Sequence, residues 1–401
     1  MKIVQINATY GVGSTGNIVE DIHKHLLSEG HESIVFWATA LKTPTDNNEK
    51  IFRIGTTIDH KLHALFRRVF DNQGFNSWFA TKSLCKKLKK LCPDVVHLHN
   101  LHSNYINLKV LLRFLAKKEI PTVITLHDCW LFTGNCTYYV QYENCQEWQK
   151  GCENCKMYRK NVTKKLLCTK KELFLKIKKL AVIGVSQWIC DEGKKSAVLS
   201  NSYIHKRIYN WVDYDLFYPI TSTNNIYEKY GLDKDKKVIL GVSQGWSDRK
   251  GLQEFYMLSE AFKDIAQVVL VGGYDDDADK SRIKFIGYTS NANELADLYS
   301  AADVFANPSR METFGKVTAE AMSCGTPVVV YNNTGSAELI SEKTGVLVED
   351  GNKEEFVAAV GEMLSKEKTE FSLACRQRVL EMFDKKKLLD EHIALYETVL
   401  E

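Results

Sequence analysis

The chain has 401 residues, more than a single hydrophobic core usually organises, so two domains of roughly 200 residues each are expected. Apolar residues at 44% and charged residues at 26% are ordinary globular values, and a net charge of +3 is too mild to indicate a nucleic-acid binder. No apolar run approaches the roughly 18 residues that span a bilayer, and the N-terminus turns polar before a signal-peptide core forms, so we expect a cytoplasmic protein.

The first half of the chain repeats a short apolar run followed by a helical segment. KIVQINA leads into a glycine-rich turn and the amphipathic segment NIVEDIHKHLLSEG. The strand signal returns in SIVFWAT, VVHLHN, TVITLHD and AVIGVS, with segments between them that are long enough for helices. Alternating strands and helices predict a mostly parallel sheet covered on both faces.

A second series of the same kind follows the aromatic, turn-rich stretch YNWVDYDLFYPITSTNN, which we interpret as a linker. Its strand signals are KVILGVSQ, QVVLVGG, IKFIGY, DVFANPS and TPVVVYN. The pattern predicts an α/β protein with two Rossmann-like, doubly wound domains, over residues 1–215 and 216–384. Residues 385–401 are predicted to form a final amphipathic helix.

Three glycines, Gly11, Gly13 and Gly16, match G-x-G-x-x-G between a predicted strand and helix. Backbone N–H groups around Gly13 could therefore cradle a phosphate. A dinucleotide site also needs an acidic residue at the end of the second strand, where the chain reads FWATAL. This disfavours an NAD-dependent dehydrogenase and leaves either an anion-binding turn or a tight turn that binds nothing.

The segment NPSRMETFGKVTAEAMSCGTPVVV is the most informative part of the chain. Gly315 stands at a predicted helix start, where close backbone approach, free N–H groups and the helix dipole favour a diphosphate. Glu312, before the helix, can accept hydrogen bonds from sugar hydroxyls, and Glu320, inside it, can accept them from a ribose. Spacing alone is equally compatible with an amphipathic helix that carries two solvated acids.

This segment resembles the E-x7-E region of family 4 glycosyltransferases of the GT-B type, and the similarity continues through EAMSCGTPVV to YNNTGSAELI and covers nearly the whole chain. In that family the first Glu contacts the donor sugar at the reaction centre, the following amides hold the pyrophosphate, and the second Glu binds the ribose. The resemblance assigns these roles to Glu312, to the amides of Thr313, Phe314 and Gly315, and to Glu320.

Further donor contacts are implied by GVSQGWSDRKGL, which resembles the family's diphosphate clamp, an Arg several residues ahead of a Lys-Gly pair. Here Gly245 stands near the usual Arg position and Arg249 directly precedes Lys250. Both cations are assigned to the diphosphate, whose charge they can offset; the alternative is two solvated cations on a loop. Gly287 and Tyr288, after another predicted strand, are expected near the donor base.

On the acceptor side, TLHDCW resembles the family's strand-end His, which makes His127 a catalytic candidate beside the donor sugar. DNQGFNSWFATKSL and PDVVHLHNLH resemble a bacterial exopolysaccharide subgroup that includes colanic-acid-type transferases. The resemblance implies that the N-terminal domain binds the acceptor and the C-terminal domain the nucleotide sugar, that the two face each other across a cleft, and that the final helix packs back on the first domain.

Four cysteines, Cys136, Cys145, Cys152 and Cys155, fall within twenty residues and end in C-x-x-C. Four thiolates can close a tetrahedral structural Zn²⁺ site; the alternatives are free thiols or a redox pair. No catalytic cofactor is expected, because Lys250, Arg249 and a helix N-terminus can offset the diphosphate charge that a metal neutralises elsewhere.

Residues 156–179 carry ten Lys or Arg against one acid. One interpretation is a solvated helix face. The other is peripheral contact with the inner face of the cytoplasmic membrane, with lysines on anionic lipid and apolar side chains on the bilayer. Those apolar side chains are Leu166, Leu167, Leu173, Phe174 and Ile177.

The resulting prediction is a retaining glycosyltransferase of the hexosyltransferase type. It moves a sugar from a UDP- or GDP-sugar to a hydroxyl of a glycan or lipid-linked saccharide in bacterial surface polysaccharide synthesis. A nucleotide-sugar epimerase of the same two-domain fold, which needs no acceptor, and a zinc-based interaction module are the alternatives.

Overall fold

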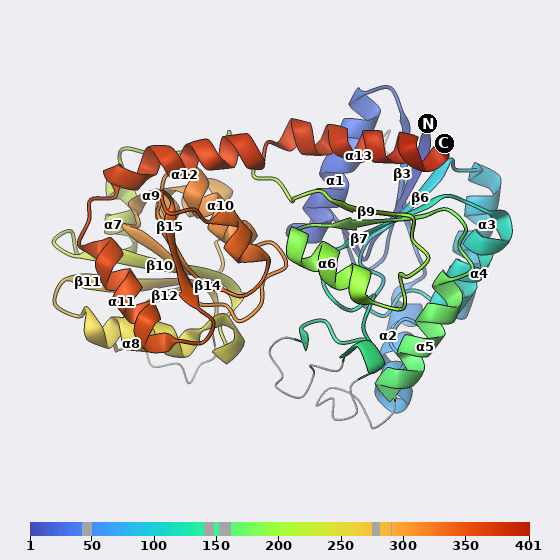
Figure 1. The fold of residues 1–401 in the computed structure, drawn as a ribbon, viewed down its shortest axis with the longest axis horizontal. Helices are drawn as coiled ribbons and strands as arrows, with labels where there is room; N and C mark the ends of the chain where they lie inside the picture. The colour runs from blue at the N-terminus through green and yellow to red at the C-terminus, as the bar shows by residue number, and fades with distance from the viewer. Residues whose placement is uncertain (42–49, 140–147, 152–161, 275–280, 290) are drawn as a thin grey trace. The chain divides into compact units, whose positions relative to one another are not determined.

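The computed structural model describes residues 1–401 except 42–49, 140–147, 152–161, 275–280 and 290 (Figure 1). The chain divides into two compact units, Met1–Tyr209 with Lys387–Glu401 and Asn210–Lys386. The first unit ends at Tyr209, earlier than the expected residue 215, because the linker residues pack within the second unit. There the Val212 amide donates to the Phe383 carbonyl at 3.4 Å.

The first unit contains a seven-stranded parallel sheet. Its order is β5 (Ile51–Arg53), β3 (Glu32–Trp37), β1 (Lys2–Ile6), β6 (Val95–Leu98), β7 (Thr122–Leu126), β8 (Leu180–Gly184) and β9 (Ile204–Arg207). A separate pair joins β2 (Thr9–Tyr10) to β4 (Ala40–Leu41). The central strands β1, β6, β7 and β8 are almost entirely buried, as expected for a sheet covered on both faces.

The helices of the first unit are α1 (Gly13–Ser28), α2 (Thr57–Phe70), α3 (Trp78–Leu91), α4 (Leu108–Lys118), α5 (Val162–Phe174) and α6 (Gln187–Lys195), with a 3-10 turn η3 (Trp148–Lys150). Local chemistry sets several of their starts. The Asn107 side chain accepts from the Val110 amide at 3.1 Å and caps α4, while Thr56 and Asp59 form a capping box for α2.

The last helix, α13 (Lys385–Leu400), completes the first unit although it follows the second in sequence. One face of α13 is buried, formed by Leu388, Leu389, His392, Leu395, Tyr396 and Val399. The Tyr396 hydroxyl lies 2.7 Å from His97 Nδ1 in β6. Apolar burial and this hydrogen bond together hold α13 on the first unit.

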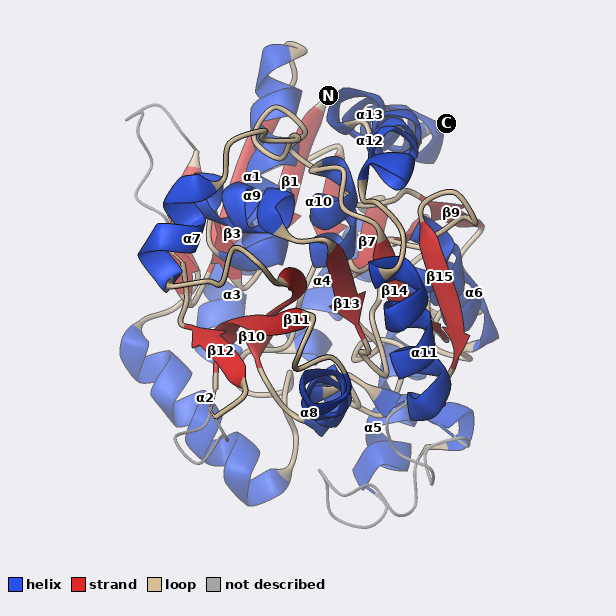
Figure 2. Cartoon of the chain, turned by 90° about the vertical axis from the view of Figure 1, so that its left-hand side faces the viewer, coloured by secondary structure: helices blue, strands red, loops and turns tan. Residues whose placement is uncertain are grey.

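The second unit contains a six-stranded parallel sheet. Its order is β12 (Ile283–Ile286), β11 (Ala266–Gly273), β10 (Lys237–Gly245), β13 (Val304–Asn307), β14 (Val328–Asn332) and β15 (Gly345–Glu349) (Figure 2). Its helices are α7 (Asn224–Tyr230), α8 (Leu252–Ala261), α9 (Ala292–Ala301), α10 (Lys316–Ser323), α11 (Lys353–Leu364) and α12 (Thr369–Met382), with 3-10 turns η4 (Asp248–Lys250) and η5 (Gly335–Leu339).

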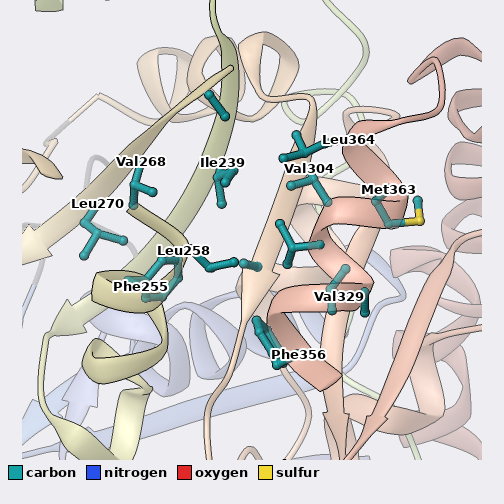
Figure 3. Close-up of a cluster of buried hydrophobic side chains, with 14 of the residues drawn as sticks. Ile239, Phe255, Leu258, Val268, Leu270, Val304, Val329, Phe356, Met363 and Leu364 are labelled. Carbon is teal, nitrogen blue, oxygen red and sulfur yellow. The ribbon is translucent and has the colours of Figure 1, made fainter. Parts of the chain in front are cut away.

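One face of this second sheet packs against α8 and α11 (Figure 3). The strands contribute Ile239, Val268, Leu270, Val304 and Val329, and the helices contribute Phe255, Leu258, Phe356, Met363 and Leu364. All ten side chains are buried, and each adds roughly 1.5–3 kcal/mol relative to exposure.

Both sheets have the doubly wound topology that the sequence predicts, and the predicted fold class is confirmed. The strand order reverses between β1 and β6 in the first unit and between β10 and β13 in the second. Ligands of such sheets bind beyond the carboxyl ends of the strands that flank the reversal. The segments after β1, β6, β10 and β13 are therefore where a site is expected.

The predicted membrane contact of residues 156–179 is wrong for the five apolar side chains on which it rests, because α5 and the residues directly after it bury them within the first unit. Leu166, Leu167, Leu173, Phe174 and Ile177 are all buried, none more than 6% exposed. Residues 156–161 lie outside the described residues. None of the helices built from the described residues has the length and apolar character that crossing a bilayer requires.

All eleven histidines of the chain lie in the first unit. Burial lowers the pKa of His23, His63, His127 and His392 to about 4. Their imidazoles are therefore neutral in the folded first unit at neutral pH, whereas they titrate near pH 6.5 when unfolded.

We expect acid to destabilise the first unit selectively. Between pH 6.5 and 4 the unfolded state binds more protons than the folded state, so this stability is present above pH 6.5 and is lost as the pH falls through 4. At pH 5 the first unit should lose about 2 kcal/mol or more relative to pH 7. Hydrogen exchange of peptides from each unit measures this; an equal loss of protection in both units would contradict it.

Candidate active site

In the second unit, the loops after β10 and β13 bring Lys250 and Glu312 together. Lys250 ends the turn η4, and its ammonium donates to the Glu312 carboxylate. The two side chains are 20% and 17% exposed, so the ion pair is partly shielded from water. Both residues are predicted donor contacts, and they lie at the topological reversal where a ligand is expected.

A shared backbone contact fixes these two loops against each other. The Arg310 amide donates to the Arg249 carbonyl at 3.0 Å. Gly251 has φ of 75°, and a Cβ added there would lie 2.3 Å from Pro308 Cγ. Only glycine satisfies both conditions, which explains physically why Lys250 is followed by glycine.

The loop after β14 also forms hydrogen bonds with the backbone of Glu312. The Glu312 amide donates to Thr334 Oγ1 at 2.9 Å, and the Gly335 amide donates to the Glu312 carbonyl at 2.8 Å. The Asn333 amide group in turn donates to the Ser309 carbonyl at 3.2 Å. Asn333 and Thr334 are not among the predicted site residues, although their place directly after a strand was a usable signal.

The start of α10 is built for close backbone approach. Gly315 is its N-cap with φ of 89°, and its carbonyl accepts from the Thr318 and Ala319 amides at 3.0 and 3.1 Å. Phe314 is buried with its ring edge-on to Phe383, at 5.2 Å between centroids. The positive end of the helix dipole therefore points toward the loop that carries Glu312, as an anion site requires.

Glu320 lies on α10 within the same unit and is buried. Burial raises the pKa of Glu320, opposed by Lys316, 3.9 Å away, and by the Tyr299 hydroxyl, which donates to Oε2 at 3.2 Å. Tyr299 fixes the orientation of the carboxyl group, and Oε1 remains directed at Lys316 on the first turn.

Gly287 and Tyr288 follow β12, the edge strand of the sheet. Tyr288 is 71% exposed, and its hydroxyl donates to the Gln244 carbonyl near the end of β10. A Cβ added at Gly287 would meet nothing within 4 Å, so the backbone there is open to a ligand.

In the first unit, three neighbouring strands align Gln5, His99 and His127. Gln5 lies in β1, and the two histidines directly follow β6 and β7. His99 Nε2 is 3.2 Å from Gln5 Oε1, and His99 Nδ1 is 3.1 Å from His127 Nε2. Gln5 and His99 are not among the predicted site residues, although His99 stands in the quoted run VVHLHN.

Hydrogen bonding along this row assigns a proton to each imidazole nitrogen. The Gln5 amide nitrogen donates to the Val19 carbonyl at 3.3 Å, so Gln5 Oε1 faces His99 and accepts from Nε2. Burial holds the pKa of His99 well below its usual value, so its ring is neutral and Nδ1 accepts. His127 must then donate from Nε2, which leaves the lone pair on Nδ1.

Asp128 and His102 anchor the turn that follows His127. His102 Nε2 lies 2.8 Å from one oxygen of Asp128, and the Trp130 amide donates to the other at 2.8 Å. Burial alone would raise the pKa of Asp128, but His102 and the Trp130 amide hold it below the usual range. This turn thus carries a stable negative charge next to His127.

Lys170 of α5 forms hydrogen bonds with the same turn. Its side chain is fully buried, and Nζ donates to the Trp130 and Thr133 carbonyls at 2.5 and 3.1 Å and lies 3.9 Å from the centroid of the Trp130 ring. At least this lysine of the basic stretch therefore serves the fold instead of a lipid surface.

In the glycine motif after β1, Gly11 and Gly16 are required by the conformation and packing of the turn, whereas Gly13 borders open space. Gly11 has φ of 63° and its amide donates to the Gly16 carbonyl at 2.9 Å. A Cβ at Gly16 would lie 2.8 Å from Thr9 Oγ1, whereas one at Gly13 would meet nothing within 4 Å. Gly13, the first residue of α1, is thus the position of the motif where a ligand has room.

Of the four cysteines predicted to bind zinc, only Cys136 is described, and it is buried. Cys145, Cys152 and Cys155 lie outside the described residues. Within the described parts of the chain, no cluster of three or more His, Cys, Asp or Glu side chains is suited to a metal ion. Structural zinc therefore stays a prediction, to be checked by metal analysis of the purified protein.

Two doubly wound units, with the Lys250–Glu312 ion pair where the strand order of the second sheet reverses, are the framework of a GT-B glycosyltransferase. Two family models match the chain, Glycosyltransferase Family 4 over residues 15–216 and Glycosyl transferases group 1 over residues 236–366. Because the first model alone spans half of the sequence, the chain belongs to glycosyltransferase family 4. The predicted family and enzyme class are confirmed.

Sequence relatives include WcaC of Escherichia coli K12, whose name assigns it to colanic acid biosynthesis. It is 23% identical, and the match covers 100% of both chains. The N,N'-diacetylbacillosaminyl-diphospho-undecaprenol alpha-1,3-N-acetylgalactosaminyltransferase of Campylobacter jejuni is 29% identical over 46% of this chain and 51% of its own.

Solved structures share the fold over the full length. Sucrose-phosphate synthase from Thermosynechococcus elongatus has a TM-score of 0.69 at 19% identity, covering 99% of this chain and 98% of its own. HepE of Anabaena, in complex with UDP, has a TM-score of 0.68 at 16% identity, covering 99% and 100%.

We expect Gly251→Ala to destabilise the second unit, because the new Cβ would clash with Pro308 at a positive φ. The expected loss is about 2 kcal/mol or more in the free energy of unfolding, measured by urea titration. Gly245→Ala, at the end of the preceding strand β10, is the matched control, since its Cβ would meet nothing within 4 Å. Equal stability of the two variants would contradict the clash.

The proton assignment predicts that His127 is an Nε2–H tautomer, detectable by two-dimensional ¹⁵N NMR of histidine-labelled protein. Gln5→Met removes the acceptor that orients His99, so both tautomers of His127 should then appear. Thr125→Val, which instead removes a partner of His97 at 2.7 Å, is the control and should leave the His127 pattern unchanged. An Nδ1–H pattern in the unmodified protein would overturn the assignment.

Proposed function

We propose that this glycosyltransferase moves a sugar from a UDP- or GDP-sugar to a hydroxyl of a glycan or lipid-linked saccharide, with retention of anomeric configuration, in bacterial surface polysaccharide synthesis. The observation that carries the proposal is the Lys250–Glu312 pair at the strand reversal beside the start of α10. WcaC, the Campylobacter jejuni transferase and HepE with UDP support it through what their names state.

The donor diphosphate would lie over the first turn of α10, with Lys250 and Arg249 as its cations. Lys250 would then exchange the Glu312 carboxylate for phosphate oxygens, which frees Glu312 to accept hydrogen bonds from sugar hydroxyls. As the bond between the anomeric carbon and the phosphate oxygen breaks, negative charge grows on the leaving nucleotide, and these cations stabilise it. The acceptor oxygen bonds to that carbon, and its proton passes to an oxygen of the leaving diphosphate.

Other residues would bind the remaining parts of the donor. Glu320, held by Tyr299, would accept hydrogen bonds from the ribose, and Gly287 and Tyr288 would lie near the base. The amides of Thr313, Phe314 and Gly315 would contact the pyrophosphate. In the first unit, Gly13 would bind a donor phosphate and His127 the donor sugar.

We propose that this chemistry needs no catalytic cofactor, since the cations and the helix dipole supply the positive charge. Both matched family models describe glycosyltransferases, which favours transfer over the epimerase alternative. Peripheral contact with an anionic membrane, on the cytoplasmic side, remains part of the proposal, through a surface other than α5.

Donor binding can be tested by thermal shift with a panel of UDP- and GDP-sugars. A ligand that binds only the folded state raises the unfolding temperature, so one nucleotide class should stabilise the protein selectively. Lys250→Met should reduce that shift while leaving the unliganded protein folded. No shift with any nucleotide sugar would contradict the proposal.

Glu312→Gln should lower the turnover number by a factor of about 10² or more, because its charge acts at the reacting sugar. The measurement is sugar transfer or, without an acceptor, donor hydrolysis. Glu362→Gln is the matched control, since Glu362 also pairs with a lysine, Lys366, but on the surface of α11. Near-normal turnover of Glu312→Gln with an intact fold would remove Glu312 from the reaction.

A further inference from the structure

Helix α2 of the first unit exposes a continuous apolar face. Six large apolar side chains recur at helical spacing along one side of Thr57–Phe70, and each is between 45% and 70% exposed. They are Ile58, Leu62, Leu65, Phe66, Val69 and Phe70. We call this set the α2 apolar face.

The orientation of α2 is the reverse of an ordinary surface helix. The side toward the protein carries His63, which is buried, lies 2.7 Å from Ser77 Oγ, and accepts from the Gly74 amide at 3.4 Å. The six apolar side chains remain exposed, and α2 is labelled in the lower left of Figure 2. An amphipathic helix held by its polar side offers its apolar side to a partner.

The neighbouring start of α3 continues the exposed apolar and basic character. Trp78 and Phe79 are 48% and 78% exposed with ring centroids 4.9 Å apart, and Lys82 lies 4.7 Å over the Trp78 ring. Beside them is a pocket of about 450 Å³. Its lining includes the aromatic side chains Trp78 and Phe114 and the cations Lys82, Lys109, Arg113 and Lys117.

Charge identifies the kind of partner. Residues 57–119 carry twelve Lys or Arg against four acids, and one of those acids, Asp59, is engaged in the capping box of α2. A symmetric contact with a second copy would place this basic surface against itself, which like charges oppose. An anionic surface is complementary to it.

The length of α2 identifies the mode of contact. Its 14 residues span roughly 21 Å, less than the roughly 30 Å of bilayer hydrocarbon. A helix of this length with one apolar face and flanking cations lies in the plane of the interface.

We propose that the α2 apolar face docks the first unit on an anionic lipid bilayer, with its side chains in the headgroup boundary and the neighbouring lysines and arginines on lipid phosphates. This deepens the membrane contact of the proposed function, for which it would bring the enzyme to a lipid-linked acceptor. Docking itself requires neither donor nor turnover.

The test is flotation of the full chain with vesicles of phosphatidylcholine that contain phosphatidylglycerol, against phosphatidylcholine alone, at low salt. Binding should require the anionic lipid. The double variants Leu62→Gln/Phe66→Gln and Arg67→Glu/Arg68→Glu should each lower the partition coefficient roughly tenfold or more. Matched controls from the second unit, Leu373→Gln and Lys343→Glu, change exposed side chains of the same kinds and should bind normally.

Three results would overturn the proposal. They are no binding of the unmodified chain, undiminished binding of both α2 double variants, or a dimer in sedimentation that the α2 variants abolish, which would assign the face to a second copy. The nucleotide-sugar thermal shift of the same variants separates the two proposals. If docking fails while the shift persists, only the α2 proposal falls; if the shift fails while docking persists, only the donor assignment falls.

Discussion

The reversal of strand order in each parallel sheet is the constraint on which the rest of the structure depends. Because all strands of a sheet end at one edge, the loops after β10 and β13 emerge side by side. That geometry alone brings Lys250 to Glu312 across 62 positions of sequence. In the first unit it likewise brings Gln5, His99 and His127 into one row from three adjacent strands.

The Lys250–Glu312 pair couples the proposed roles of two residues that belong to separate sequence motifs. Each charge compensates the other while both are partly buried, so removal of one leaves its partner in an unfavourable state. Effects of substituting the two residues should therefore not add. Under the proposed function, donor affinity would reflect the difference between a phosphate contact of Lys250 and the carboxylate contact that it replaces.

The fold was predictable, and the residues proposed to bind the donor could be selected, because the signals for both are local. Apolar runs ending in Gly, Ser or Asn mark strand ends, and the E-x7-E segment holds Glu312, Gly315 and Glu320 within one loop and helix. Gln5 and His99 were not predictable, because their importance lies in partners far along the chain. A histidine in a strand run has no distinctive spacing that reveals the nitrogen to which it will hydrogen-bond.

Helices α5 and α2 show why surface predictions from amphipathic patterns fail. Both combine lysines or arginines with an apolar stripe, and the sequence favoured α5 for the membrane because its cations are denser. The structure buries the α5 stripe and draws Lys170 inside, while α2 is attached through His63 and leaves its stripe in solvent. The spacing of apolar residues shows that a helix has an apolar face and a polar face. Only tertiary contacts decide which of the two faces is buried. In α2 the buried side chain is the polar His63, 2.7 Å from Ser77 Oγ, and the apolar stripe is the part left exposed.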